Sequence, residues 1–329
     1  MLISRVVSAR TSRVEEVPTP EPGPGQVLVE ILASGVCTSD LTPWLTGPAA
    51  DADPIALGHE ITGRVVAVGP GASRWREGEL VTGLGGPGFA THAVLDADLL
   101  LPVPAGVEPA HAIGEPIATL EEAVSRTPIH AGSRVAVVGL GFMGLGLLQL
   151  ARTRAPGTLI GVDPNPEARE RALALGAHVA LHPDEVAAFV AADGSAGGSA
   201  GGAAGGSVPG SADPRADVVL EATGVTPGLA TASPLVRPFG TLCVVGYHHA
   251  GTAPFDMELW YKGATIVNGF CPDHPRVMRA MSDALDHVAS RRFTFAPLVT
   301  HRFGLDDVDA AYTLMADRAP GFVKAVIEP

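Results

Sequence analysis

Cysteine is scarce in this chain of 329 residues, which has only three, at positions 37, 243 and 271. Three cysteines can supply neither a disulfide framework nor a zinc cluster with four thiolate ligands. The low, odd number is typical of a reducing compartment, and we therefore expect a cytoplasmic protein.

Positive charge is scarce as well. The chain has 22 basic and 35 acidic residues, a net charge of −13, and only Lys262 and Lys324 among the basic residues are lysines. An acidic chain without a basic run repels nucleic acid and anionic membrane surfaces, so we expect neither as a partner. We attach no function to the scarcity of lysine itself.

Long hydrophobic runs are missing too. Residues 1–13 contain three arginines and no apolar core, so they do not resemble a signal peptide. Residues 135–151 carry no charge, but 17 residues with four glycines are too short and too rich in glycine for a membrane helix. A strand, a turn and a helix explain these glycines better, and we expect no membrane association.

The chain does contain enough apolar residues, 46 %, to build hydrophobic cores, and its length predicts two domains of roughly 150 residues each. In the first third, short apolar runs alternate with Gly and Pro turns, which predicts a compact β-barrel-like domain. Its expected strands are residues 27–31, 61–68, 80–82 and 89–95.

From about residue 134, apolar strands alternate with helical segments. This alternation predicts an α/β domain with a doubly wound parallel sheet. The expected strands are residues 134–138, 158–162, a short one near 179, 217–221 and 240–245; the expected helices are residues 144–155, 166–175 and 184–191. A helix over residues 275–290 and a return to β structure follow.

Residues 192–212 are almost entirely Gly, Ala and Ser. Such a composition cannot bury enough apolar surface to order itself, so we expect a flexible surface loop. It falls between a helix and a strand of the second domain, where an insertion is tolerated.

A glycine-rich turn follows the expected strand 134–138. Gly139, Gly141 and Gly144 form a G-x-G-x-x-G motif that opens a helix, the fingerprint of dinucleotide binding. Their roles are a tight turn, close approach of the backbone to a pyrophosphate, and close packing of helix on strand. Asp163 ends the next strand, 19 residues after Gly144, where a carboxylate binds the ribose hydroxyls and repels a 2′-phosphate. We therefore expect NAD(H) rather than NADP(H).

Two short runs in the first domain carry potential metal ligands. Cys37 lies close to Ser39 and Asp40, His59 is followed by Glu60, and Glu115 is a further candidate. A catalytic zinc needs about three protein ligands and one open position, and thiolate, imidazole and carboxylate are a suitable mixed set. These residues alone also fit a buried cysteine and a histidine in a turn, and both interpretations stay open at this point.

Several runs taken together resemble the zinc-dependent medium-chain dehydrogenase/reductase family of alcohol, sorbitol and threonine dehydrogenases. The resemblance covers nearly the whole chain. It rests on residues 16–29, 35–40, the signature Gly58-His-Glu-x-x-Gly63 with Gly69, residues 77–81 and 115–117, the glycine fingerprint, Glu221-Ala-Thr-Gly224, and residues 323–329. It implies a GroES-like β-barrel catalytic domain built from residues 1–128 and 270–329, around a Rossmann NAD-binding domain of residues 129–269.

The resemblance also implies roles for individual residues. Cys37, His59 and Glu115 bind one catalytic zinc, and Glu60 is a neighbouring carboxylate that can approach the metal. Ser39 is the proton-relay hydroxyl, and Asp40 orients the imidazole of His59. The implied cofactor-binding residues are Thr119, Gly139, Gly141, Phe142, Met143, Gly144, Asp163, Thr223 and Gly246.

Three departures from the family pattern matter. No cysteine lies between residues 37 and 243, so the structural zinc and its lobe are missing. Thr42 stands where some relatives have a relay histidine, which leaves the proton route beyond Ser39 open. The insertion at 192–212 is atypical.

The expected reaction is oxidation of a secondary alcohol or polyol by NAD, in a cleft between the domains. Glu115 favours the polyol branch, and relatives that pair through sheet edges imply a homodimer or homotetramer. The alternatives are a zinc-free reductase that acts on an activated double bond and a catalytically silent NAD-binding protein. For six residues, the sequence leaves open whether they line the cleft or simply pack against their neighbours: Leu41, Trp44, Phe89, His92, Tyr247 and His248.

Several other histidines and cysteines lie outside these motifs. We expect His111, His130 and His301 at the surface or as caps. We expect Cys243 in the core of a strand and Cys271 packed.

Overall fold

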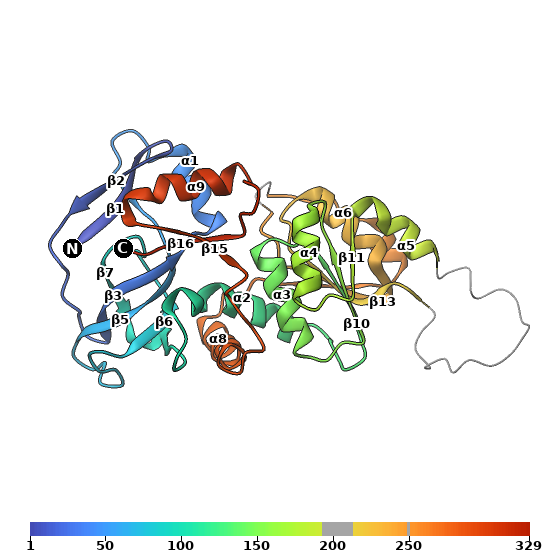
Figure 1. Ribbon diagram of the computed structural model, residues 1–329, viewed down its shortest axis with the longest axis horizontal. Helices are drawn as coiled ribbons and strands as arrows, with labels where there is room; N and C mark the ends of the chain where they lie inside the picture. Colours follow the sequence, from blue (N-terminus) through green and yellow to red (C-terminus); the bar gives the residue numbers. More distant parts are fainter. Residues whose placement is uncertain (193–212, 249–250) are drawn as a thin grey trace, which may run out of the picture. The chain divides into compact units, whose positions relative to one another are not determined.

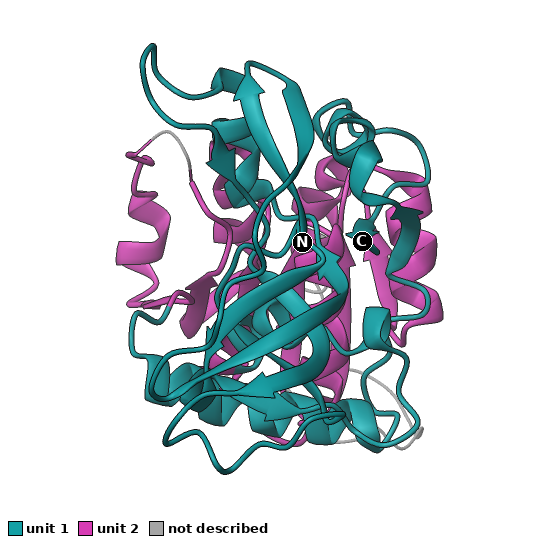
Figure 2. Cartoon of the chain, turned by 90° about the vertical axis from the view of Figure 1, so that its left-hand side faces the viewer, with its two compact units in different colours: residues 1–121, 271–329 teal, residues 122–270 magenta. Residues whose placement is uncertain are grey.

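The computed structural model describes residues 1–192, 213–248 and 251–329. These residues form two compact units (Figure 2). Unit 1 contains residues 1–121 and 271–329, from both ends of the chain, and unit 2 contains residues 122–270. Helix α2 (Gly114–Ser125) contains the first boundary between the units, and the predicted domain boundary after residue 128 lies shortly beyond the end of this helix.

Unit 1 is built mainly of antiparallel strands. A seven-stranded sheet has the order β15-β16-β3-β5-β6-β8, with β7 paired to β3, and a small second sheet has the order β2-β1-β4. The strands are β1 Leu2–Ser8, β2 Thr11–Glu16, β3 Gln26–Gly35, β4 Ile55–Ala56, β5 Glu60–Val68, β6 Leu80–Leu84, β7 His92–Asp96, β8 Leu100–Pro102, β15 Val299–Phe303 and β16 Lys324–Ile327. The further helices are α1 Leu41–Thr46, α8 His274–Ala289 and α9 Val308–Ala316.

The sheet of unit 1 brings distant parts of the chain together. Strand β16, near the end of the sequence, pairs with β3, so that the red and blue segments of Figure 1 lie side by side in this unit. The predicted strand at residues 89–95 is shorter than expected and begins at His92. Phe89 precedes it as a fully buried residue.

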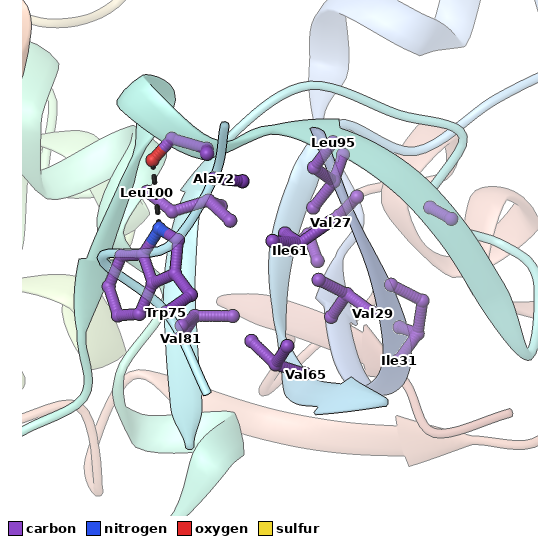
Figure 3. Packing of buried hydrophobic residues seen from close by; sticks show 12 residues of the cluster. Val27, Val29, Ile31, Ile61, Val65, Ala72, Trp75, Val81, Leu95 and Leu100 are labelled. Atoms are coloured by element: carbon purple, nitrogen blue, oxygen red, sulfur yellow. Dashed lines mark hydrogen bonds between the residues drawn. The ribbon is translucent and has the colours of Figure 1, made fainter. Parts of the chain in front are cut away.

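The main core of unit 1 lies against β3 and β5 (Figure 3). Val27, Val29 and Ile31 alternate along β3 and therefore point to one face of the sheet. Trp75 closes one end of this core, and its Nε1 donates a hydrogen bond of 2.9 Å to the carbonyl of Ala97. The apolar pattern of the first third thus produces the predicted packed β unit.

A second core in unit 1 contains two residues, Trp44 and Phe89, for which the sequence left open whether they line a cleft or pack in the interior. The rings of Trp44 and Tyr312 stack at a centroid distance of 5.4 Å, and Phe89 packs edge-on against Tyr312. Trp44 is 1 % exposed and Phe89 is fully buried. Both are therefore interior packing residues and not lining residues of a cleft.

Unit 2 contains the predicted doubly wound parallel sheet. Its strand order is β11-β10-β9-β12-β13-β14, and all of these pairs are parallel. The strands are β9 Arg134–Val138, β10 Thr158–Val162, β11 Val179–Leu181, β12 Ala216–Glu221, β13 Val236–Val244 and β14 Thr265–Asn268. The helices are α3 Phe142–Arg152, α4 Pro166–Ala174, α5 Val186–Ala192, α6 Thr226–Leu235 and α7 Met257–Tyr261.

Several predicted helix boundaries in unit 2 shift. Helix α3 begins at Phe142 rather than at residue 144 and ends at Arg152, because Ala155 adopts a left-handed conformation with φ of 54°. The helix predicted from residue 184 starts as a 3-10 turn at Pro183–Glu185 and continues as α5. The predicted loop at 192–212 lies outside the described residues, apart from residue 192, where α5 ends.

Some elements escaped the sequence patterns altogether. They are β1, β2, β4, β8, β14 and the helices α1, α2, α6, α7 and α9. Helix α6 has the sequence TPGLATASPL, whose Gly, Pro, Ser and Thr residues are poor helix formers. It packs on β12 and β13, and this tertiary contact overrides the weak local preference.

Within the described ranges, no helix has the length and apolar character needed to cross a membrane. The uncharged residues 135–151 fold as most of β9, a glycine turn and most of α3.

Candidate metal centre and dinucleotide crevice

The potential metal ligands come together where β3 ends and β5 begins. These strands are antiparallel neighbours, with Gly35 opposite Glu60. Cys37 follows the end of β3, and His59 immediately precedes β5. One ligand atom from each of Cys37, His59 and Glu60 lies within 4.8 Å of the others. The sheet therefore gathers a thiol, an imidazole and a carboxyl group that the sequence separates.

Asp40 fixes the orientation of His59. Its Oδ2 lies 3.2 Å from Nδ1 of His59 and accepts a hydrogen bond of 3.1 Å from the backbone N–H of Gly58. Gly58 has φ of 87°, a left-handed conformation that glycine adopts without strain. Tyr312 adds its hydroxyl at 3.5 Å from the same oxygen, a contact that sequence patterns gave no reason to expect. With Nδ1 held in this way, Nε2 is the nitrogen left for a metal.

Ser39 lies beside the same ligand atoms. Its Oγ is 3.2 Å from Sγ of Cys37 and 3.4 Å from Nε2 of His59, and the residue is exposed. A hydroxyl in this position reaches both the candidate ligands and solvent. It can pass a proton between a group bound there and water.

The centre attracts positive charge. Burial alone lowers the pKa of His59, but hydrogen bonds and charges from Asp40 and Cys37 outweigh it and raise that pKa to about 11. Two acidic partners thus favour a cation at the imidazole, and a divalent metal supplies one more strongly than a proton does. The donor set of thiolate, imidazole and carboxylate also matches zinc. The residues present therefore fit a zinc ion.

Glu60 has a partner that sequence reasoning missed. Nζ of Lys324 on β16 lies 2.7 Å from Oε1 and 2.6 Å from Oε2 of Glu60, and both side chains are buried. A Cβ at Gly35, on the strand between them, would overlap Oε2 of Glu60. The strand order β16-β3-β5 creates this ion pair. In the sequence, Lys324 stood out only as one of two lysines and as part of residues 323–329, which contribute to the family resemblance.

Glu115 lies in the first turn of α2. Burial, together with the charge of Glu60, raises the pKa of Glu115 to about 7, whereas His59 and Lys324 act in the opposite direction. Glu115 is thus close enough to feel the centre electrostatically. Among the described residues, the compact three-ligand cluster does not include it, and its role as a ligand stays a prediction.

In unit 2, each glycine of the fingerprint has a distinct surrounding. Gly139 has φ of 88°. A Cβ at Gly144 would overlap the carbonyl oxygen of Gly139, so helix and turn are in direct backbone contact. A Cβ at Gly141 would have no described atom within 4 Å. The turn therefore leaves open space above Gly141, where a pyrophosphate can approach the backbone.

Helix α3 starts directly after this open glycine. Its N-cap is Gly141, and in the described chain no side chain caps it. The positive dipole end of the helix therefore lies at this open glycine and favours an anion there. Phe142 is buried in the first turn, and Met143 beside it is half-buried.

Asp163 follows β10 and reaches back to the glycine turn. Its Oδ2 accepts a hydrogen bond of 2.7 Å from the backbone N–H of Leu140, and its Oδ1 accepts one of 2.8 Å from Asn165. Arg169 on α4 donates to the carbonyl oxygens of Asp163 and Pro164 at 2.7 and 2.9 Å. The guanidinium of Arg169 therefore holds the backbone that carries the carboxylate of Asp163, and sequence reasoning identified only the carboxylate.

Thr223 and Gly246 lie at the other side of the glycine turn. The strand order reverses between β9 and β12, and parallel sheets bind ligands at this switch point, outside the carboxyl ends of the strands. Thr223 follows β12, and its Cγ2 would touch a Cβ at Gly139. Gly246 follows β13. Thr119 belongs instead to α2 in unit 1 and is half-buried there.

The remaining titratable candidates stand apart from both sites. Cys243 is fully buried, which raises the pKa of its thiol to about 12 and confirms it as a core residue. Cys271 is half-buried, with Sγ 3.8 Å from the carbonyl of Asp273. His111 lies 3.3 Å from Glu108, His130 is exposed, and His301 stacks on Phe303.

Comparisons with known proteins indicate the family and the fold of this chain. Residues 23–105 match the model of the alcohol dehydrogenase GroES-like domain, and residues 143–287 match that of the zinc-binding dehydrogenase. The chain is 27 % identical to sorbitol dehydrogenase of Halalkalibacterium halodurans, over 91 % of both chains. It is 29 % identical to NADP-dependent isopropanol dehydrogenase of Thermoanaerobacter brockii, over 94 % of both. Among solved structures, 2R,3R-butanediol dehydrogenase from Bacillus subtilis shares the fold, with a TM-score of 0.81, 23 % identity, and coverage of 100 % of this chain and 99 % of the other.

Proposed function

Because the chain belongs to the zinc-dependent medium-chain dehydrogenase family, we propose that it transfers hydride between a secondary alcohol or polyol and NAD. The family resemblance that the sequence motifs indicated is thus confirmed. The observation that carries the proposal is the compact cluster of Cys37, His59 and Glu60 with the hydroxyl of Ser39 beside it. The matches to sorbitol and isopropanol dehydrogenases, together with Glu115, support an alcohol or polyol substrate.

Each residue of the metal centre has its own role in this reaction. A bound zinc supplies Lewis acidity that lowers the pKa of an alcohol. Cys37, His59 and Glu115 would hold that zinc, with Glu60 as an alternate ligand, and Asp40 holds the imidazole of His59 in position. Ser39 accepts the proton of the substrate hydroxyl and releases it to solvent.

Unit 2 positions the hydride acceptor. The backbone at Gly139, Gly141 and Gly144 and the first turn of α3, with Phe142 and Met143, would bind the pyrophosphate. Thr223 and Gly246 would border the nicotinamide half, to which Thr119 is assigned as a further contact. We assign the catalytic domain to residues 1–128 and 270–329 and the NAD-binding domain to residues 129–269.

Metal analysis combined with turnover tests this function. We expect about one zinc per chain, because the three cysteines leave no set of four thiolates for a second, structural ion. Chelation should abolish NADH formation from a panel of secondary alcohols and polyols, and added zinc should restore it. Full activity without metal would instead favour the zinc-free reductase. Bound zinc and NAD with no turnover on any alcohol would favour the silent protein.

The choice of NAD over NADP is supported by Asp163. Its carboxylate is held by the backbone of Leu140 at the glycine turn, where it would repel a 2′-phosphate. Arg169 is the competing feature, because an arginine at this place accommodates that phosphate. A comparison of kcat/KM for NAD and NADP decides between the two residues.

A homodimer or homotetramer is supported by the edge of the sheet in unit 2. In the described chain β14 has one neighbour, β13, so its other edge is open. Exposed aromatic and aliphatic side chains lie on and beside this edge: Phe239, Trp260, Tyr261 and Ile266. We expect a second copy to cover them. Light scattering should give a multiple of the chain mass, and Ile266→Lys should reduce it to that of one chain.

We also place the protein in the cytoplasm. Cys37 must stay a free thiolate to bind zinc, which a reducing compartment favours. Fractionation of cells that express the full-length protein tests this assignment.

A further inference from the structure

Unit 2 contains a buried acidic residue to which the proposed function gives no role. Glu221 is the last residue of β12, and its side chain is fully buried. Oε1 accepts hydrogen bonds from the backbone N–H groups of Thr223 and Gly224 at 2.6 and 3.2 Å, and from the hydroxyl of Thr223. A buried carboxylate is costly unless it is well paired, so this residue calls for a second partner on Oε2.

That partner is His248. Its Nε2 lies 3.0 Å from Oε2 of Glu221, and its side chain is 14 % exposed. The imidazole therefore has one end against a buried carboxylate and a small part of its surface accessible. His248 was one of the residues that the sequence left open between lining a cleft and packing.

The pair lies in the crevice of the parallel sheet. Glu221 ends β12, which adjoins β9 at the point where the strand order reverses. The next residues of the chain reach the glycine turn, since Thr223 would touch a Cβ at Gly139. In a doubly wound sheet, the half that carries the glycine turn binds one nucleotide and the other half binds the second. Glu221 and His248 belong to that second half, which serves the nicotinamide nucleoside.

The contact with Glu221 fixes the proton on His248. An ionised carboxylate only accepts hydrogen bonds, so Nε2 must carry the hydrogen. In the neutral ring, Nδ1 is then a hydrogen-bond acceptor. An acceptor matches the donors of a nicotinamide nucleoside, which are the ribose hydroxyls and the carboxamide NH₂. It does not match the pyrophosphate, which offers acceptors only.

The imidazole is not needed to hold the loop together. The backbone N–H groups of Val245 and Gly246 already donate to the carbonyl of Glu221 at 2.8 and 2.9 Å. Gly246 also lies so close to Gly224 that a Cβ would overlap its backbone nitrogen. The backbone thus joins the segments after β12 and β13, and the side-chain pair adds an imidazole that is 14 % exposed and oriented by Glu221.

We propose that Glu221 holds His248 so that Nδ1 accepts a hydrogen bond from the nicotinamide nucleoside of the bound cofactor. His248 is then a cofactor-binding residue that determines how the nicotinamide is held. Glu221 is a positioning residue that acts through it. The inference rests on the proposed function, because it requires that unit 2 binds a nicotinamide dinucleotide.

Binding measurements on the full-length, zinc-loaded protein test the pair. NADH affinity is measured by fluorescence, and AMP, which lacks the nicotinamide half, by displacement of NADH. His248→Ala should lower the affinity for NADH about 3- to 10-fold, which corresponds to the loss of one hydrogen bond, and leave the affinity for AMP unchanged. His248→Gln, which keeps a donor for Glu221 and an acceptor, should recover most of this loss. His130→Ala, at an exposed histidine of the same unit, is the matched control.

A cofactor analogue identifies the donor. 3-Acetylpyridine adenine dinucleotide in its reduced form lacks the carboxamide NH₂ but keeps the ribose. If the amide is the donor, His248→Ala should not weaken this analogue; if a ribose hydroxyl is the donor, the loss should equal that for NADH. Glu221→Gln, whose amide no longer fixes the ring proton, should weaken NADH less than His248→Ala does.

Two outcomes overturn the inference. Unchanged NADH affinity in His248→Ala would show that the imidazole does not reach the cofactor. Equal weakening of NADH and AMP would show that it only supports the crevice. In both cases the wild type still binds NADH, and the proposed function stands. A wild type that binds no nicotinamide dinucleotide would overturn both the function and the inference.

Discussion

The two sites of this protein are built in opposite ways. At the metal centre of unit 1, side chains carry the chemistry, and strand pairing collects them from distant parts of the sequence. In the crevice of unit 2, the backbone carries the chemistry, and one short motif supplies most of it. Glu60 and Lys324 meet across a separation of 264 residues, whereas Gly139 and Gly144 are five residues apart in one turn. The first site should therefore be sensitive to chemical changes of single side chains, and the second to added bulk.

The largest effect is expected at Cys37. Cys37→Ser replaces the thiolate of the cluster, and we expect loss of bound zinc and at least about a hundredfold loss of NADH formation, since zinc contributes several kcal/mol to such a reaction. NADH binding should persist, because the crevice does not depend on this side chain. Elemental analysis and fluorescence titration measure the two effects. Cys271→Ser is the matched control and should keep both zinc and activity.

Lys324 tests how much the metal centre depends on long-range pairing. Lys324→Met leaves Glu60 buried without its cation, and we expect unfolding to become easier by about 3 to 5 kcal/mol. Urea unfolding of the metal-free protein measures this. Lys262→Met is the comparison. Lys262 pairs with the half-exposed Glu258, so this substitution should lower the free energy of unfolding by less. The double variant Lys324→Met with Glu60→Gln should recover stability; if it does not, the ion pair is not the cause.

Gly141 tests the backbone site. A Cβ there meets no described atom within 4 Å, so Gly141→Val should fold with stability within about 1 kcal/mol of the wild type. It should nevertheless lower the affinity for NADH roughly a hundredfold, because the side chain occupies the space above the turn. Bound zinc should stay unchanged. A variant that binds NADH normally would show that the pyrophosphate does not approach this glycine.

Gly144 provides the contrast within the same motif. A Cβ there overlaps the carbonyl of Gly139, so Gly144→Val should lower stability by more than about 3 kcal/mol. Thermal unfolding compares the stabilities of Gly141→Val and Gly144→Val. Similar values would contradict the open space at Gly141 and the close backbone contact at Gly144.

Asp40 tests the orientation of a ligand rather than the ligand itself. Asp40→Asn keeps the size of the side chain but removes the charge beside Nδ1 of His59. We expect zinc affinity to fall about 10- to 100-fold, as for other partners of metal-bound histidines. Competition with a chelator gives the affinity. Asp53→Asn, at an exposed carboxylate of the same unit, should have no effect.

The smallest effect is expected at Asp163. Asp163→Asn keeps an oxygen for the N–H of Leu140 but removes the charge, and the preference for NADH over NADPH should fall about tenfold, the equivalent of 1.4 kcal/mol. The ratio of the two dissociation constants measures it. Glu170→Gln, at a nearby exposed carboxylate, is the control. An unchanged ratio would assign the selectivity to other residues, with Arg169 the first to examine.

The same contrast explains what the sequence could predict. Strands β9 and β10 follow from local spacing, and the structure agrees with their predicted bounds residue by residue. The left-handed turn at Gly139 and the close contact at Gly144 fit their predicted roles, and the approach of a pyrophosphate to Gly141 stays a prediction. The chemistry of Cys37, His59 and Glu60 left a metal site and plain packing open, and the family resemblance favoured the metal site. No local rule brings the end of β3 and the start of β5 together.

Arg169 was missed although its contacts are local, with the carbonyls of Asp163 and Pro164, because no motif marks an arginine there. Lys324 and Tyr312 were missed because each reaches its partner through a tertiary contact and carries no local signature. The pairing of Glu221 with His248 arises in the same way, from the adjacency of β12 and β13. For Trp44 and Phe89 the sequence left lining and packing open, because aromatic residues near a ligand motif are as well suited to a core as to a cleft.

The two lysines give the protein an unusual chemical property. Both ammonium groups are buried: that of Lys324 against Glu60, and that of Lys262 against Glu258 and the carbonyl of Ser233. Reagents that acylate side-chain amines therefore find their targets covered in the folded state. Labelling at Lys324 would report opening of unit 1 and labelling at Lys262 would report opening of unit 2, so the native sequence already contains one covalent reporter of local unfolding in each half.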